Sequence, residues 1–163
     1  MATTTMANPP VDSNPAENLK LQISRVIRAS RQRTFDAWTR PDYIRQWFGG
    51  SRTLAEVETD PREGGAYLIK ANASTTEPDM NRDASISGRY VKVQPYDLLS
   101  FTWVGDWNPT EETLVTITFK DVTEGTEVTV IHERFATELS RSKHEQGWTN
   151  STNKLKSFLE STS

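Results

Sequence analysis

The sequence contains no cysteine among its 163 residues. Disulfide bonds, cysteine nucleophiles and thiolate-bound metal sites are therefore excluded. Histidine is almost as scarce, because only His132 and His144 are present. Two histidines in separate predicted elements do not favour a catalytic zinc site, and the run HERFA after position 131 departs from the zinc motif H-E-x-x-H. No metal and no other cofactor is expected.

A large net charge and long apolar runs are also absent from the sequence. The net charge is −3 with a pI near 5.5, and no cluster of lysine and arginine indicates a nucleic-acid partner. No apolar run approaches the roughly 20 residues of a membrane span. The first 20 residues lack the basic and apolar regions of a signal peptide, so a cytoplasmic protein is expected. Phosphate-loop, dinucleotide-binding and serine-hydrolase motifs are absent.

Composition divides the chain into a tail and one domain. Residues 1–18 are rich in threonine, asparagine, proline and alanine, which is typical of a disordered tail. Residues 19–163 are expected to form a single domain, since their number fits one hydrophobic core. A strand is predicted from Leu19, where apolar and polar residues alternate.

Two short helices are predicted directly after this first strand. Ser30 is a good N-cap, and Phe35 and Trp38 then lie three residues apart on one helical face. Pro41 favours the start of a second short helix, which Gly49 and Gly50 end.

Six further strands are predicted from the period-two pattern that follows. The expected ranges are 52–59, 65–72, 84–93, 98–105, 112–121 and 125–134. Short connections between them predict an antiparallel sheet with one apolar face. In the turn DPREGG, Asp60 and Arg62 are expected to pair, and Gly64 and Gly65 are expected to allow sheet bending and close backbone approach.

The last part of the chain changes to helical spacing. Trp148, Thr152, Leu155 and Leu159 follow one another at steps of four, three and four residues. They predict one long helix that begins between residues 137 and 140 and ends near 159. Such a helix must bury its apolar stripe, and the apolar sheet face is the only large surface available. The fold class is therefore α+β, with a curved seven-stranded antiparallel sheet wrapped around a long C-terminal helix.

The chain resembles the activator-of-Hsp 90-ATPase-like (AHSA-type) family. That family belongs to the START-like, polyketide-cyclase-like (SRPBCC) superfamily, whose domains have the helix-grip fold. The resemblance rests on five stretches in the right order: RVIRASRQRTFDAWTRPDYIRQWF, DPREGG, GRYVKVQPYDLLSFTW, TEVTVIHERF and GWTNSTNKLKSFL. It implies the helix-grip fold, but its relatives include chaperone ATPase activators, carriers of hydrophobic ligands, and cyclases or hydrolases, so the site must be argued separately.

A binding function is the first interpretation. A curved sheet and a straight helix leave space between them, which predicts a hydrophobic cavity for a small apolar or amphipathic molecule. The expected ligand-binding residues are inward-facing aromatics and one histidine: Trp47, Phe48, Tyr67, Phe101, Trp103, His132 and Trp148. Each could instead be an ordinary core residue. Glu56 and Glu58 are expected to face outward, and His144 is expected to be a solvated residue of the last helix.

Two other interpretations stay open. A cyclase- or hydrolase-type enzyme would use the same cavity, with His132 as the candidate general acid or base. An activator of a chaperone ATPase would act through protein contacts, with the loop around Trp107 as its surface, although the eukaryotic activators carry an amino-terminal domain that this sequence lacks. The sequence predicts a monomer or a homodimer.

Overall fold

The computed structural model describes residues 19–161, so the predicted tail, residues 1–18, lies outside the described part of the chain. One antiparallel sheet has its seven strands in the order β1-β7-β6-β5-β4-β3-β2. The strands are β1 (Lys20–Ile27), β2 (Leu54–Thr59), β3 (Ala66–Ala71), β4 (Ala84–Gln94), β5 (Leu98–Gly105), β6 (Thr113–Val122) and β7 (Gly125–Glu133). The helices are α2 (Arg31–Thr39), α3 (Pro41–Trp47), the short 3-10 helix η2 (Pro78–Met80) and α4 (Glu138–Ser161).

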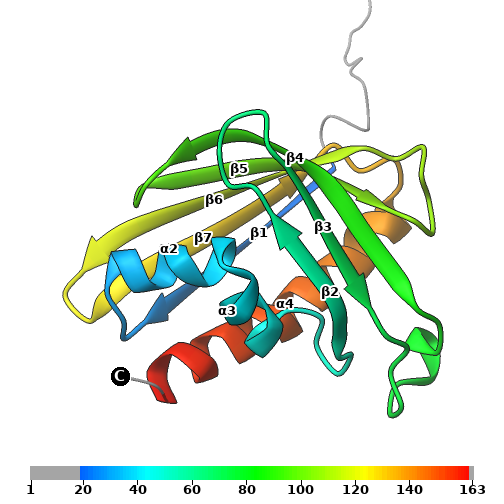
Figure 1. Cartoon of the computed structure of the whole chain (residues 1–163), viewed down its shortest axis with the longest axis horizontal. Helices are drawn as coiled ribbons and strands as arrows, with labels where there is room; N and C mark the ends of the chain where they lie inside the picture. The colour runs from blue at the N-terminus through cyan, green and yellow to red at the C-terminus, as the bar shows by residue number, and fades with distance from the viewer. Residues whose placement is uncertain (1–18, 162–163) are drawn as a thin grey trace, which may run out of the picture.

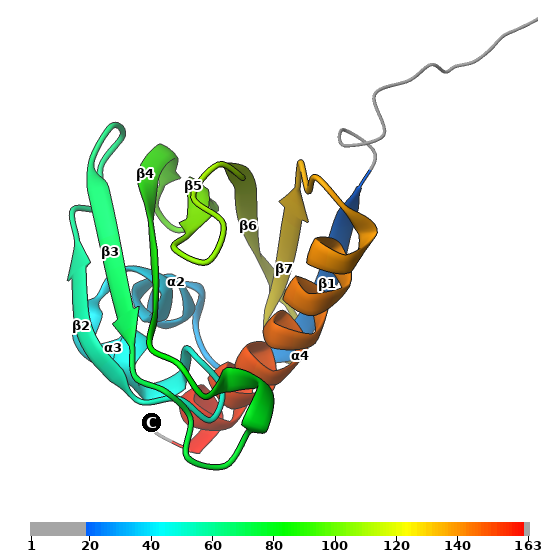
Figure 2. The ribbon, with the colours of Figure 1, turned by 90° about the vertical axis from the view of Figure 1, so that its right-hand side faces the viewer.

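The predicted fold class is confirmed. The sheet curves around α4, and α2 with α3 lies inside the same curve (Figure 1). Seen after a quarter turn, the strands form an arc and α4 runs along its β7–β1 side (Figure 2). No helix within residues 19–161 is long and apolar enough to span a membrane.

The concave face of the sheet is apolar because alternate residues point inward. On β6, Val115, Ile117 and Phe119 are at most 4% exposed. Their partners on β7 are His132, Val130 and Val128, which are also buried. These cross-strand pairs form the floor on which the helices pack.

Helices α2 and α3 fill one part of this concave face. The side chain of Ser30 caps α2 by accepting a hydrogen bond from the Arg33 backbone N–H at 3.1 Å. Phe35 then reaches Phe119 of the sheet, with 5.3 Å between the ring centroids. The indole N–H of Trp47 in α3 donates to the carbonyl of Ala37 in α2 at 2.9 Å, which fixes the two short helices together.

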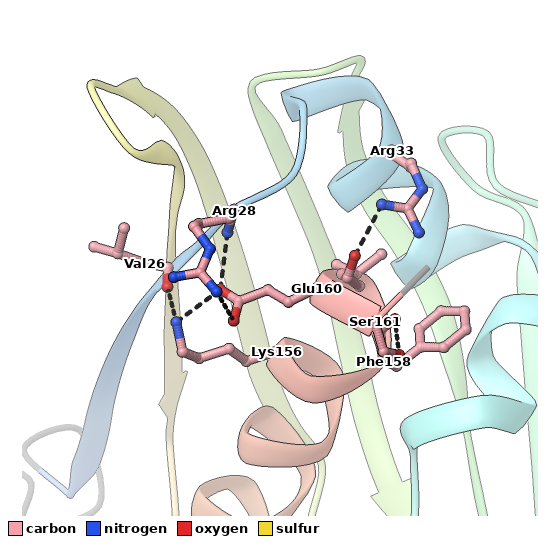
Figure 3. Close-up of polar contacts among 8 residues, drawn as sticks. Val26, Arg28, Arg33, Lys156, Phe158, Glu160 and Ser161 are labelled. Atoms are coloured by element: carbon pink, nitrogen blue, oxygen red, sulfur yellow. Dashed lines mark hydrogen bonds and ion pairs between the residues drawn. The ribbon is translucent and has the colours of Figure 1, made fainter. Parts of the chain in front are cut away.

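Helix α4 packs its predicted stripe on the sheet and its last turn on the edge strand β1. Leu155 and Leu159 are fully buried. Lys156 Nζ donates to the Val26 carbonyl at 2.6 Å, and the Arg28 backbone N–H donates to Glu160 at 3.0 Å (Figure 3). These side chains cover backbone groups at the end of the edge strand β1 and just after it.

The DPREGG turn shows why two glycines precede β3. A Cβ atom on Gly65 would lie 2.0 Å from the Asp60 carbonyl oxygen, so only glycine fits there. Gly64 has a φ of +85°, and its N–H donates to Tyr90 of β4 at 2.8 Å. The expected Asp60–Arg62 pair is present at 2.9 Å. The prediction of close backbone approach at this turn is confirmed.

Candidate functional site

A small pocket lies between the helices and the sheet, and its wall is mostly aromatic. Its volume is about 30 Å³. The lining residues come from all three helices α2, α3 and α4 and from four strands: Trp38, Ile44, Trp47, Phe48, Thr59, Tyr67, Ile69, Tyr90, Phe101, Trp103 and Trp148. We call this space the inner pocket. All the ligand-binding candidates named from the sequence line it except His132.

The inner pocket is too small to be the large cavity expected between sheet and helix. A volume near 30 Å³ holds about one water molecule, whereas ligand pockets span roughly 300–1,000 Å³. Interlocking rings fill the remaining space. The ring centroids of Trp38 and Trp47 are 4.7 Å apart, and those of Trp103 and Trp148 are 5.2 Å apart. The aromatic residues therefore form much of the core as well as the pocket wall.

A much larger space opens beside the inner pocket. This outer cleft has a volume of about 810 Å³. Its walls are the first half of α4, strands β3, β4 and β5, the loop after α3, the segment around η2 and the β5–β6 loop. Phe48, Ile69, Trp103 and Trp148 line both spaces. A ligand in the outer cleft would thus rest on the aromatic wall of the inner pocket. The cleft lies between α4 and strands β3, β4 and β5, so a large space between helix and sheet is present, as the sequence analysis expected. The contribution of the surrounding loops was not predicted.

Two large apolar side chains stand exposed at the mouth of the outer cleft. Trp107 of the β5–β6 loop is 54% exposed, and Leu139 in the first turn of α4 is 65% exposed. Both residues line the cleft. The Trp107 ring packs beside His144, with 6.0 Å between the centroids.

A short hydrogen-bonded chain ties the β5–β6 loop to the start of α4. Glu111 accepts from the Ser140 hydroxyl and from the Ala136 backbone N–H, both at 2.8 Å. One turn further along α4, His144 Nδ1 donates to the Ser140 carbonyl at 2.7 Å. This chain holds one side of the cleft in place.

His144 lines the cleft, so the expectation of a solvated residue is wrong. Its imidazole packs against Phe135 and Trp103, with centroids 5.0 Å and 6.0 Å away. Burial lowers the pKa of His144, although the hydrogen bond to Ser140 and the nearby Glu111 charge oppose the shift. No sequence pattern indicates this placement, since residues from other elements cover the ring.

His132 occupies a different environment. It is fully buried and lines neither space. Its Nδ1 accepts from the Trp148 indole N–H at 2.9 Å, so the proton is on Nε2, which donates to the Thr113 hydroxyl at 2.7 Å. That hydroxyl donates in turn to the Trp103 carbonyl at 3.1 Å. Burial, with a smaller contribution from His144, holds the pKa of His132 well below its usual range.

The geometry of His132 favours a structural role over the candidate roles in catalysis or binding. Both ring nitrogens are engaged, and a general acid or base must reach its substrate. The bonded chain from Trp148 through His132 to Thr113 instead joins α4 to β7 and β6.

The carboxylates of β2 face away from both spaces, as expected. Val57 is 7% exposed and points inward, while Glu56 and Glu58 line neither space. Glu56 pairs with Lys70 on β3 at 3.4 Å. Within residues 19–161, no group of three or more acidic or histidine side chains could hold a metal ion.

Comparison with known proteins identifies the family. Residues 28–160 match the family described as "Activator of Hsp90 ATPase homolog 1-like protein". The chain belongs to this family. No curated protein sequence matches the chain significantly.

Solved structures of other proteins share the fold. A protein from Chromobacterium violaceum is 22% identical, with a TM-score of 0.77 over 86% of this chain and 97% of that one. An AHSA1-like protein from Aeromonas hydrophila is 22% identical, with a TM-score of 0.70 over 87% and 92% of the two chains. The AHSA1 protein from Silicibacter pomeroyi is 20% identical, with a TM-score of 0.74 over 86% and 96%. At these identities the likeness establishes the fold alone.

Proposed function

We propose that this chain is a binding protein that holds a small apolar or amphipathic molecule in the outer cleft. The observation that carries the proposal is a cleft of about 810 Å³ with an aromatic floor. That volume lies within the range of small-molecule sites, and apolar walls with a few polar groups are typical of them.

The charges around the cleft support an amphipathic ligand. Side chains of both signs line it, among them Arg52, Asp106, Glu111 and Lys143. Phe48, Trp103 and Trp148 form its apolar floor. A molecule with an apolar body and a polar end matches this separation, because its body is desolvated on the rings while its end stays near charged and hydrated groups.

An enzyme that uses the same cleft is the second candidate function. The observation that favours it is the imidazole of His144, which lines the cleft and whose pKa is lowered by burial. A neutral imidazole can accept a proton from a bound substrate. The third interpretation, activation of a chaperone ATPase, would use exposed Trp107 as a contact.

A thermal-shift screen of fatty acids, aromatics, flavonoids and sterols tests the binding proposal. A ligand that binds only the folded state adds about 2.7 kcal/mol at a hundredfold excess over its dissociation constant. For a domain of this size, that corresponds to roughly 5–10 °C in Tm. The same compound should change the tryptophan fluorescence.

A matched pair of variants tests whether the ligand binds in the outer cleft. Gly147 lines the cleft, and a Cβ atom there would meet no atom within 4 Å. Gly147→Leu should therefore fill part of the cleft and abolish the thermal shift without unfolding the protein. Gln146→Leu, on the same helix but outside the cleft lining, should leave the shift intact. Equal shifts in the two variants, or no stabilising compound at all, would contradict the proposal.

A further inference from the structure

The four tryptophans of the inner pocket fall into two pairs. The indole N–H of Trp47 donates to the Ala37 carbonyl at 2.9 Å, and that of Trp148 donates to His132 at 2.9 Å. The indole N–H groups of Trp38 and Trp103 are also buried but have no acceptor among residues 19–161. Their side chains belong to residues only 5% and 6% exposed.

Two buried donors without acceptors in one pocket wall call for an explanation. Almost all buried N–H groups in folded proteins have a partner, and an exception often indicates a ligand or an ordered water molecule. The crowding of the pocket is not a sufficient cause, because Trp47 and Trp148 in the same wall are satisfied by the protein itself.

We propose that Trp38 and Trp103 recognise a neutral hydrogen-bond acceptor, such as a ketone or amide oxygen, at one end of the ligand. The inner pocket, about 30 Å³, accommodates a group the size of a carbonyl oxygen. The rest of the molecule lies in the outer cleft, since Trp103 and Trp148 line both spaces. This inference rests on the proposed function and specifies the chemistry of its ligand.

The acceptor is neutral because the inner pocket contains no cation. None of its lining residues is charged, and its polar side chains are Thr59, Tyr67 and Tyr90. A carboxylate would lose its hydration there without gaining a positive partner, which is costly. A pure hydrocarbon would leave both indole N–H groups unsatisfied.

Two of the three hydroxyl groups of the pocket already donate to backbone carbonyls of the protein. The Thr59 hydroxyl donates to the Thr39 carbonyl at 2.8 Å. The Tyr67 hydroxyl donates to the Thr102 carbonyl at 2.6 Å. Their protons are thus already used, and the two indole N–H groups and the Tyr90 hydroxyl are the donors left for a ligand oxygen.

Three compounds with one skeleton test the inference: 1-tetralone, tetralin and 1,2,3,4-tetrahydro-1-naphthoate. The full chain is labelled with ¹⁵N at its tryptophan indoles and titrated with each. We expect 1-tetralone to bind roughly tenfold more tightly than tetralin, which is the size of effect that hydrogen bonds contribute. The naphthoate should bind more weakly than the ketone. The indole proton signals of Trp38 and Trp103 should move downfield with 1-tetralone and not with tetralin.

Phenylalanine substitutions assign the effect to single donors. Trp38→Phe and Trp103→Phe remove an N–H but keep an aromatic ring, so each should lose most of the preference for 1-tetralone over tetralin. Tyr43→Phe is the control, since it also removes a polar hydrogen from an aromatic ring but at a residue that lines neither space. It should keep the preference. The titration of the unsubstituted chain stands even where a variant does not fold.

The outcomes separate this inference from the proposed function. Equal affinity for 1-tetralone and tetralin, or tighter binding of the naphthoate, overturns the inference and leaves the binding function standing. The same holds if a crystal structure with 1-tetralone bound shows a water molecule still bonded to both indole nitrogens. If neither these compounds nor any other in the thermal-shift screen binds, both the inference and the proposed function fail.

Discussion

The two halves of helix α4 differ in burial and in what they contact. Residues 152–161, the packed half, include Leu155 and Leu159, which are fully buried. Residues 138–151, the cleft half, supply every residue of α4 that lines the outer cleft. Leu139 in the cleft half is 65% exposed, although leucine is as apolar there as at position 155.

The polar contacts of the two halves also differ: those of the packed half reach the sheet, and those of the cleft half reach a loop. In the packed half, Lys156 and Glu160 bond to backbone groups at the end of β1 (Figure 3). In the cleft half, Glu111 and Ser140 hold a loop rather than a strand. The packed half therefore anchors the helix to the sheet, which leaves the cleft half free to carry side chains that a ligand can contact.

The largest expected contrast comes from one substitution made in each half. Leu155→Ala removes a fully buried side chain and should lower the free energy of unfolding by about 2–5 kcal/mol. Leu139→Ala makes the same change at an exposed position and should stay within about 0.5 kcal/mol of the parent. Urea denaturation of both variants measures the difference. Similar losses would show that the cleft half is as tightly packed as the other.

The two histidines predict a dependence of stability on pH. Burial lowers the pKa of both His132 and His144 in the folded state, so below about pH 6.5 the unfolded chain binds protons that the folded chain does not. The free energy of unfolding should be greatest above that pH. It should then fall with decreasing pH by up to about 1.4 kcal/mol per pH unit for each histidine.

A single variant separates the two histidines. His144→Gln removes the histidine of the cleft wall and should reduce the slope between pH 6.5 and 5.5 toward the value for His132 alone. The comparison needs urea titrations at several pH values in this range, which lies above the titration of most carboxylates. A slope that the substitution leaves unchanged would mean that His144 titrates alike in the folded and unfolded chains.

Regular patterns made much of the fold predictable, and tertiary contacts decided the rest. Alternation placed Val128, Val130 and His132 on the inner face, and helical spacing placed Leu155 and Leu159 on the sheet, because each pattern depends only on neighbouring residues. The inner pocket residues followed from the same patterns. Their tight packing, however, depends on how rings from distant segments interlock.

The candidate site was harder to predict because long-range contacts define it. His144 has polar neighbours in the sequence, and its burial comes from Phe135 and Trp103. The role of His132 depends on bonds to Thr113 and Trp148, residues that only the folded chain brings together. Loops supply part of the cleft wall, and their course has no periodic signature in the sequence.

A small expected effect of opposite sign comes from an alanine substitution at Gly147, for which the same substitution at Gly65 is the contrast. A Cβ atom on buried Gly65 would lie 2.0 Å from the Asp60 carbonyl oxygen, so Gly65→Ala should cost about 1–3 kcal/mol through overpacking. A Cβ atom on Gly147 in the cleft half would meet nothing within 4 Å, and alanine is the better helix former. Gly147→Ala should therefore stabilise the protein by up to about 1 kcal/mol. Thermal or urea unfolding of both variants shows whether each substitution raises or lowers the free energy of unfolding. Destabilisation by Gly147→Ala would show that the cleft half of α4 is more crowded than its contacts indicate, and the distinction between the two halves would lose its simplest support.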